Sequence, residues 1–328
     1  MKAVRMTGFG GVGVLQIGEH PDPLPKADEL LVRIRATALN RADLLQRRGK
    51  HPPPEGASGI LGLEMAGEVD EAGPACEGWS PGDRVCALLP GGGYAQKATM
   101  PAGMGMRIPD GLSYEEAAAI PEVFLTAYHN LFLLGGLRPG MTVLVHAGGS
   151  GVGTAAIQLI REAGGESLVT AGSLPKVARC RDLGARGGWN YREGPFAPWV
   201  ADQTGGRGVD LVLDLVGAPY IGQNLASLAV DGKLIVIGTM GGSVAERVNL
   251  LDLLFRRLQI LGTSLRSMGT ERKIDLTKRF SAFALPRFAD GRLRPVIDSV
   301  WDWTEVAGAH RRMEANANVG KIVLRVGE

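Results

Sequence analysis

The stretch Val143-Leu-Val-His-Ala-Gly-Gly-Ser-Gly-Val-Gly-Thr-Ala-Ala-Ile-Gln-Leu-Ile160 decides the fold. Residues 142–147 form a short, apolar, β-branched run, typical of a strand buried on both faces of a parallel sheet. Four glycines then lie within residues 148–153, here called the glycine turn, and a helix follows that ends at Gly164-Gly165. Such a unit presents free backbone N–H groups at a positive helix end, which suits a pyrophosphate.

The glycine turn departs from the dinucleotide-binding fingerprint at one position. The fingerprint is G-x-G-x-x-G, and here it reads Gly148-x-Ser150-x-x-Gly153, with Gly151 beside the serine. A tight turn with a purely structural role is therefore the alternative to a phosphate site. The esterase elbow G-x-S-x-G would need a glycine where the chain has Val152.

Strands and helices alternate after the glycine turn. Apolar strand candidates recur at 167–171, 209–215, 233–237 and 259–262, with helix-length segments between them. This alternation predicts an α/β fold with a doubly wound parallel sheet. Gly217 and Gly238 follow two of these strands, at the edge where such a sheet meets its ligand.

Composition narrows the class of protein. The chain has 328 residues, enough for two domains with separate cores, and a net charge of +2, which gives no electrostatic footprint for nucleic acid. Its three cysteines show no C-x-x-C spacing, which favours a reduced, cytoplasmic setting. Because no signal core and no apolar run of membrane length is visible, we expect a soluble protein with no membrane partner.

Residues 1–122 predict a β-rich domain. Apolar and polar residues alternate over 30–38, typical of a half-exposed antiparallel strand, and further strands are expected at 65–70, 84–88 and 94–99. Ser113-x-x-Glu116 is a capping box that opens a short helix, which Pro121 stops. Residues 126–134 are expected to form the next helix, which leads into the dinucleotide-binding domain.

The tail is too short for a third domain. A helix is expected at 307–316 and a final strand at 321–326. We therefore predict that residues 266–328 cross back to complete the first domain, and that residues 123–265 form the dinucleotide-binding domain.

Five motifs in this order carry a family resemblance. They are Ala-Leu-Asn-Arg-Ala-Asp (38–43), Gly62-Leu-Glu64, Ala117-Ala-Ala-Ile-Pro-Glu122, the glycine turn and Gly320-Lys-Ile-Val-Leu324. Together they resemble the medium-chain dehydrogenase/reductase superfamily over nearly the whole chain. Within it the chain is similar to the zinc-free, zeta-crystallin-like quinone oxidoreductases, and most closely to the p53-inducible branch. The resemblance implies a GroES-like catalytic domain, a Rossmann domain, and NADPH and substrate bound between them.

Zinc is not expected. A catalytic zinc needs three protein ligands of Cys, His or carboxylate type. Asn40 and Leu63 stand where zinc alcohol dehydrogenases place Cys and His, and Glu64 alone cannot make a site. The four-cysteine structural lobe is also missing. We predict a metal-free protein.

The cofactor is expected to be NADPH. An NAD enzyme carries an acid about 20 residues beyond the glycine turn, whereas this chain has Leu-Val-Thr-Ala-Gly-Ser-Leu-Pro-Lys176. Ser173 and Lys176 could bind a 2′-phosphate, and the resemblance gives Lys176 and Tyr191 that role; Ser173 as a helix cap and Tyr191 as a plain strand-end aromatic are the alternatives. The complete set of candidate cofactor contacts is Thr126, Gly148, Ser150, Gly151, Val152, Gly153, Gly172, Ser173, Lys176, Tyr191, Val216, Gly238, Met240 and Ser264.

The candidate catalytic residues are Asn40, Asp43 and His51. The resemblance places Asn40 and Asp43 near the nicotinamide and substrate, and Thr126 beside the nicotinamide amide. A cap or intrahelical role is the alternative for Asp43. His51 stands where the branch usually has Tyr; it could donate a hydrogen bond or be an idle loop residue, which leaves the general acid open.

The sequence thus predicts a metal-independent NADPH:quinone oxidoreductase. An NADPH-dependent reductase of 2-alkenals or enones, and an NADPH-binding sensor with little turnover, remain alternatives. A homodimer is expected through the apolar edge strand near 259–264.

Overall fold

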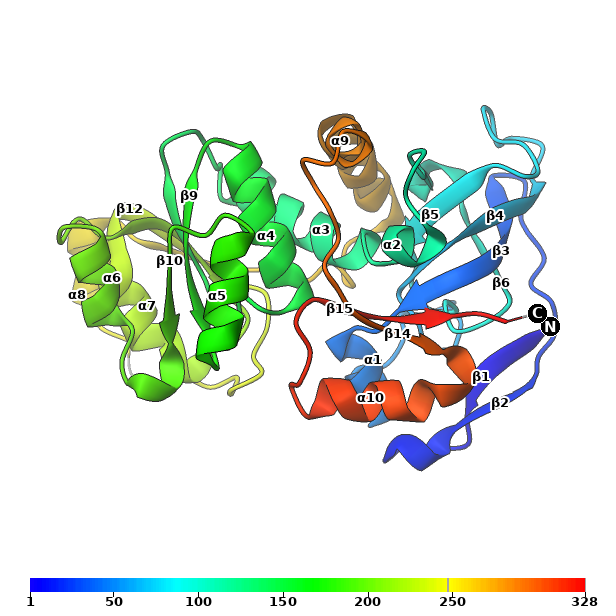
Figure 1. Ribbon diagram of the computed structural model, residues 1–328, viewed down its shortest axis with the longest axis horizontal. Helices are drawn as coiled ribbons and strands as arrows, with labels where there is room; N and C mark the ends of the chain where they lie inside the picture. Colours follow the sequence, from blue (N-terminus) through cyan, green and yellow to red (C-terminus); the bar gives the residue numbers. More distant parts are fainter. Residues whose placement is uncertain (247, 328) are drawn as a thin grey trace. The chain divides into compact units, whose positions relative to one another are not determined.

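The structure is a computed structural model that describes residues 1–246 and 248–327. The chain forms two compact units, the first made of residues 1–125 and the segment from 266 onward, the second of residues 126–265 (Figure 1). The boundary falls inside helix α3, Pro121–Tyr128. No helix among the described residues combines the length and apolarity needed to cross a membrane.

The second unit contains a parallel sheet. Its described strands follow the order β10-β9-β8-β11-β12-β13. Their bounds are β8 Thr142–Val145, β9 Glu166–Ala171, β10 Gly187–Asn190, β11 Val209–Asp214, β12 Leu228–Val236 and β13 Gln259–Gly262. Numbered within this unit the order is 3-2-1-4-5-6, the order of the Rossmann fold, so the predicted doubly wound sheet is confirmed.

Helices cover both faces of this sheet. Leu168, Leu144, Val212 and Leu234 stand in register across four strands. They form one buried core with residues of α6 (Ala197–Gln203) and α7 (Ile221–Ser227). Residues of α5 (Leu174–Asp182) pack against Val169, which points to the opposite face. This unit also contains helices α4 (Gly151–Glu162) and α8 (Leu250–Arg256).

The first unit contains a mixed sheet that joins distant parts of the chain. Its described strands run β14-β15-β3-β4-β5-β7, with β6 also paired to β3. The bounds are β3 Glu29–Ala38, β4 Glu64–Ala72, β5 Arg84–Leu88, β6 Lys97–Pro101, β7 Met106–Arg107, β14 Ile297–Asp302 and β15 Lys321–Arg325. Strands β1 (Lys2–Met6) and β2 (Leu15–Glu19) form a separate hairpin. Because β15 pairs antiparallel with β3, the tail completes this unit (Figure 1).

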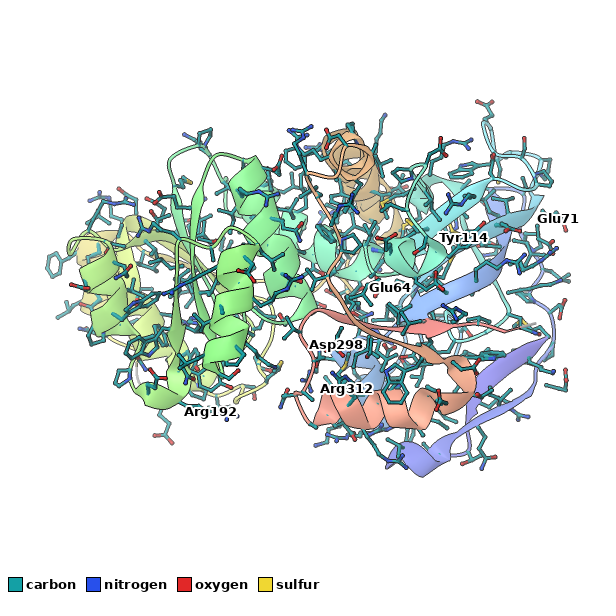
Figure 2. The ribbon with its side chains drawn as sticks, viewed as in Figure 1. Glu64, Glu71, Tyr114, Arg192, Asp298 and Arg312 are labelled. Carbon is teal, nitrogen blue, oxygen red and sulfur yellow. The ribbon has the colours of Figure 1, made fainter. Side chains whose placement is uncertain are left out.

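Four further helices belong to the first unit. They are α1 (Arg41–Arg47), α2 (Tyr114–Ala118), α9 (Thr270–Ala289) and α10 (Val306–Glu314). Arg312 of α10 donates two hydrogen bonds to Asp298 of β14, at 2.5 Å and 3.0 Å, and both residues are labelled in Figure 2. The pair fixes α10 against the added strands. The predicted capping box is present: Ser113 accepts from the Glu116 N–H at 3.1 Å.

Three sequence-based expectations need correction. Pro121 opens α3 rather than only ending a helix, because the first helical position needs no N–H donor. A π-helical segment, His129–Leu134, continues from α3 where a regular helix was expected. Strand β3 is largely buried instead of half-exposed. Even Thr37 is buried, and its hydroxyl is satisfied because it donates to the Glu64 carbonyl at 2.6 Å. The sequence reading also missed α9 and the strands β1, β2, β7, β10 and β14.

Candidate functional site

The glycine turn places α4 directly behind strand β8. Ser150 is the N-cap of α4, and its Oγ accepts the Gly153 N–H at 3.0 Å. A Cβ at Gly153 would collide with the Ala147 carbonyl, and one at Gly148 would lie 2.9 Å from Cys180 Sγ. Both positions therefore require glycine. Since the N–H groups of Gly151 and Val152 precede the first helical hydrogen bond, they are available to a phosphate.

The entry to the glycine turn is conformationally unusual. Ala147 has a φ of 51°, in the left-handed region that residues with a Cβ rarely adopt. Its carbonyl accepts the Ser150 N–H at 2.8 Å, which closes the turn. Such local strain is typical of functional loops. A Cβ at Gly149 would lie 3.4 Å from the Lys176 side chain, so Lys176 lies over the turn.

Residues that follow β9 and β10 gather beside Lys176. Gly172 follows β9, and a Cβ there would lie 2.6 Å from the Tyr191 hydroxyl, so the tyrosine lies against this glycine. Ser173 occupies the N-cap position of α5, but its side chain makes no capping hydrogen bond. The structure thus places Tyr191 against Gly172, next to Ser173, and Lys176 in the first turn of α5, with no acid between Gly172 and Lys176.

The remaining predicted cofactor contacts of this unit lie beyond strand ends, except for Thr126, which lies in a helix. Val216 follows β11, Gly238 and Met240 follow β12, Ser264 follows β13, and Thr126 lies in α3. Gly241 donates to the Val216 carbonyl at 2.8 Å, and Ala218 donates to the Gly242 carbonyl at 2.9 Å. The loops after β11 and β12 therefore form one hydrogen-bonded lip at the carboxyl edge of the sheet.

A buried polar chain, which the sequence reading missed, lies beneath this edge. We call Thr170, His146, Asn224 and Asp214 the switch-point network. His146 Nδ1 lies 2.8 Å from Thr170 Oγ1, and its Nε2 lies 2.6 Å from Asn224 Oδ1. Asn224 Nδ2 donates to Asp214 Oδ2 at 3.0 Å. Burial lowers the pKa of His146 to about 4, so this histidine is neutral at pH 7.

In the first unit, Asn40 belongs to a buried ionic cluster. Lys321 Nζ lies 2.7 Å from Glu64 Oε1, and donates to Asn40 Oδ1 at 2.6 Å and to the Leu39 carbonyl at 2.7 Å. Asn40 Nδ2 donates to Glu64 Oε1 at 2.8 Å and to the Ala38 carbonyl at 3.3 Å. Because the ammonium only donates and the carboxylate only accepts, the orientation of this amide is fixed. Glu64 is labelled in Figure 2.

These contacts give Asn40 a bracing role. Both of its amide hydrogens and its oxygen are engaged within the protein, and the side chain is buried. From the sequence, the Asn40 amide was expected to donate to substrate, but in the structure this amide already donates to Glu64 and to the Ala38 carbonyl. A direct contact between Asn40 and substrate stays a prediction.

Asp43 caps helix α1, the alternative left open from the sequence. Its carboxylate accepts the N–H groups of Asn40 at 2.7 Å and Gly62 at 3.0 Å, and the Tyr94 hydroxyl at 3.4 Å. Burial raises the pKa of Asp43 to about 6, against the lowering effect of the two backbone donors. Asp43 therefore organises the start of α1, and a catalytic contact stays a prediction.

His51 lies near Arg266, and Arg266 and Glu122 are charged residues that sequence reasoning missed. Burial lowers the pKa of His51, and the positive charge of Arg266 lowers it further. Arg266 donates to Gln46 Oε1 at 2.8 Å, one turn along α1 from Asp43. Burial raises the pKa of Glu122 to about 8, and the Glu64 carboxylate adds to this rise. Glu122 ends one of the five resemblance motifs, but no role was expected for it from the sequence, and Arg266 lies in none of these motifs.

Comparison with known proteins identifies the family. Residues 26–126 match the alcohol dehydrogenase GroES-like domain, and residues 183–324 match the zinc-binding dehydrogenase family. The human synaptic vesicle membrane protein VAT-1 homolog is 30% identical over 342 residues, which cover 100% of this chain and 87% of that protein. Rat quinone oxidoreductase is 28% identical over 327 residues, with 99% and 97% covered. A solved mycobacterial structure in complex with NADPH superposes with a TM-score of 0.89 at 31% identity, covering 99% of this chain and 100% of that one.

The chain belongs to the medium-chain dehydrogenase/reductase superfamily, in its quinone oxidoreductase group. It is thus an oxidoreductase of this superfamily, and the neighbours together with the glycine turn support a nicotinamide cofactor. Its first unit is the GroES-like domain, and its second unit is the Rossmann domain.

Zinc, which the name of one matching family implies, does not fit the residues present. Glu64 is the only carboxylate at the positions where zinc relatives place their ligands, and it is already bound by Lys321 and Asn40. Leu63 and Asn40 offer no zinc-binding side chain of Cys, His or carboxylate type. Among the described residues, no group of three or more His, Cys, Asp or Glu side chains could hold a metal ion.

Proposed function

We propose that this protein is an NADPH-dependent, metal-independent reductase of small quinones. The observation that carries the proposal is the arrangement after β9, where Lys176 lies over the glycine turn and Tyr191 lies against Gly172. A lysine and hydroxyl donors at this place suit a 2′-phosphate, because hydrogen bonds to a charged phosphate are the strong ones. The chain lacks the Asp or Glu with which an NAD enzyme binds the ribose 2′-hydroxyl.

The reaction needs an acceptor that stabilises its own charge. The reduced nicotinamide, when bound, supplies a hydride. The Lys321 ammonium beside Asn40 is engaged by Glu64, so we do not expect it to polarise a simple ketone. A quinone oxygen is conjugated to the ring and spreads its developing charge, so modest hydrogen-bond donors suffice.

We assign the candidate catalytic residues the following roles. Asn40 and Asp43 hold the start of α1 and the Gly62 segment in place through the contacts described above. His51, neutral at pH 7 because its pKa is lowered, donates at most one ring N–H to substrate. Glu122, whose pKa is raised to about 8, is a further candidate for holding a proton near neutral pH.

The proposal is tested by following NADPH oxidation with a panel of small quinones and a matched panel of enones. We expect turnover of benzoquinone and an ortho-quinone that a chelator does not remove. Turnover of enones alone would assign the protein to the alkene reductases. NADPH binding without turnover of either panel would favour the sensor alternative, and loss of activity on chelation would contradict the metal-free assignment.

We also propose a homodimer and a cytoplasmic location. Strand β13 is the last strand of the described sheet, and α8 exposes Leu250, Leu251, Leu254 and Phe255. An open sheet edge beside exposed apolar side chains is an expected pairing surface for a second copy. The three cysteines are buried and form no disulfide, in keeping with a reducing compartment.

A further inference from the structure

The switch-point network joins the two strands between which the sheet order reverses. His146 leaves β8 one residue before Ala147, and Asp214 is the last residue of β11. These strands are neighbours in the sheet, and the chain departs from them in opposite directions. In open α/β sheets the ligand crevice lies outside the carboxyl ends of such a strand pair. The network is therefore placed directly beneath the expected cofactor crevice.

The hydrogen bonds of the network have a defined direction. Asp214 accepts the Val216 N–H at 2.7 Å and the Gly217 N–H at 3.1 Å, and also the Asn224 amide. Since Asn224 Nδ2 donates to Asp214, its Oδ1 is the atom that faces His146 and must accept. His146 therefore carries its proton on Nε2, and its Nδ1 accepts the Thr170 hydroxyl. Every member is satisfied with a neutral histidine.

The network supports a turn whose conformation requires glycine. Gly217 has a φ of 88°, and a Cβ there would lie 2.6 Å from the Gly242 carbonyl oxygen. Asp214 binds both N–H groups of this turn, which in turn bonds to the loop after β12. A buried network that is fully satisfied rigidifies its surroundings, whereas a partly satisfied one is costly.

We propose that the switch-point network is a positioning device that holds the Val216–Gly217 turn in the conformation that binds the nicotinamide side of the dinucleotide. This inference rests on the proposed function, which makes Val216 a cofactor contact. Asn224 is its key residue, because it alone links the histidine of β8 to the carboxylate of β11. None of the four residues needs to touch the cofactor.

The test compares binding of whole NADPH with binding of 2′,5′-ADP, the fragment expected at Lys176, Ser173 and Tyr191. In Asn224→Leu we expect the dissociation constant of NADPH, measured by fluorescence, to rise about tenfold or more, equivalent to about 1.4 kcal/mol. Binding of 2′,5′-ADP, measured by calorimetry, should change less, staying within about twofold, because Lys176, Ser173 and Tyr191 are not members of the network and Tyr191 reaches His146 through the ring of Tyr220. Amide exchange at Val216 and Gly217 should become faster.

Ser227→Ala is the matched control on the same helix. Ser227 is buried, and its hydroxyl donates only to the Gln223 carbonyl of its own helix at 2.8 Å. It should leave the binding of both ligands unchanged. Equal losses of NADPH and 2′,5′-ADP in Asn224→Leu, or no loss of NADPH, would overturn the proposal.

Asp214→Asn provides a second, conservative variant and a spectroscopic signature. An amide at position 214 can keep the Val216 N–H bond with its oxygen, but its nitrogen must donate to Asn224. Asn224 then reverses, and His146 must move its proton from Nε2 to Nδ1. With only five histidines in the chain, nitrogen shifts of labelled histidine report this switch. We expect the His146 proton to move to Nδ1, and the dissociation constant of NADPH to stay within about threefold of the wild-type value. An unchanged tautomer would contradict the proposed direction of the hydrogen bonds.

Failure of the proposed function gives a different pattern. The binding measurements need no turnover, so a wild-type protein that reduces no quinone leaves them intact. If the wild type prefers NADH, the same comparison with NADH and adenosine monophosphate tests the network. Loss of NADH binding alone in Asn224→Leu would then support it, and equal losses would overturn it.

Discussion

Asn40 shows how one residue's contacts change its expected chemistry. The side chain was expected to donate to substrate, but it bridges Lys321 and Glu64 instead. Lys321 and Glu64 are both almost fully buried, so each charge depends on the other and on Asn40. At this scale the chemistry of a residue is decided by which of its atoms remain unengaged.

Removing Lys321 should be far more damaging than removing a surface cation. Lys321→Met leaves the Glu64 carboxylate buried without its ion pair, which typically costs about 3–5 kcal/mol. The free energy of unfolding, measured by urea denaturation, should fall by this amount. Adding Glu64→Gln should recover part of the loss.

Arg325→Met is the control for the Lys321 prediction. Arg325 lies on the same strand, and its ion pair with Glu115 at 2.8 Å is largely exposed on the arginine side. Because exposed pairs contribute about 0–1 kcal/mol, this variant should unfold almost like the wild type. Similar losses of unfolding free energy for Lys321→Met and Arg325→Met would show that the buried ion pair contributes no more to stability than the exposed one.

Lys176 is expected to select the cofactor. Lys176→Ala removes a cation that can bind the 2′-phosphate, a contact worth about 1.5–3 kcal/mol. NADPH should therefore bind roughly ten- to hundredfold more weakly, while NADH binding stays almost unchanged. Fluorescence titration with both nucleotides measures this, and equal losses would rule out Lys176 as the discriminating residue.

At the scale of elements, the proposed cofactor-binding turns of the second unit follow the ends of strands β8 and β11. The glycine turn leaves β8 and the Val216–Gly217 turn leaves β11, and the switch-point network ties them together. His146 and Asp214 are the titratable members of this network, and burial lowers the pKa of His146 and raises that of Asp214. These pKa shifts therefore connect the packing of the Rossmann domain to pH.

His146 should make the second unit less stable in mild acid. Its pKa falls from the ordinary 6.5 to about 4 on folding, so the unfolded chain binds the proton first. The stabilisation is complete above pH 6.5 and is lost as pH falls toward 4, by roughly 3 kcal/mol. In His146→Gln, which cannot titrate, the free energy of unfolding should fall less over this range by about that amount.

The comparison cancels the titration of groups outside the switch-point network. Burial also lowers the pKa of His310 to about 3, with the same sign, but His310 is present in both proteins and cancels in the difference. Urea denaturation at pH 7 and pH 4 gives the two free energies. Equal losses of unfolding free energy in the wild type and in His146→Gln would show that the pKa of His146 does not change on folding.

At the scale of the whole molecule, exposed apolar side chains indicate self-association. Leu254 and Phe255 of α8 are 67% and 75% exposed, next in sequence to edge strand β13. Exposed apolar groups gathered on one element are typical of protein interfaces. The Rossmann domain therefore carries the expected dimer surface.

Charges on α8 should separate the dimer. In the double variant Leu254→Lys with Phe255→Lys, light scattering at about 10 μM should change from a dimeric to a monomeric mass, because unpaired buried charge opposes association. Leu24→Lys, at an 86% exposed leucine of the first unit, should remain dimeric. A monomeric mass for the wild-type protein would contradict the proposed homodimer.

The sequence by itself determined the parts that depend on neighbours along the chain. Apolar runs of strand length, the glycine turn and the Ser113–Glu116 capping box each specify local structure through backbone geometry and burial. The apolar runs and the glycine turn were enough for the Rossmann sheet, and the family was predicted from a resemblance carried by five short motifs. The tertiary structure decided the rest, because the deciding partners are distant: Lys321 meets Asn40 across 281 residues, and His146 meets Asn224 across 78. No local pattern encodes such pairs, since only the closed sheets bring their atoms within hydrogen-bonding distance.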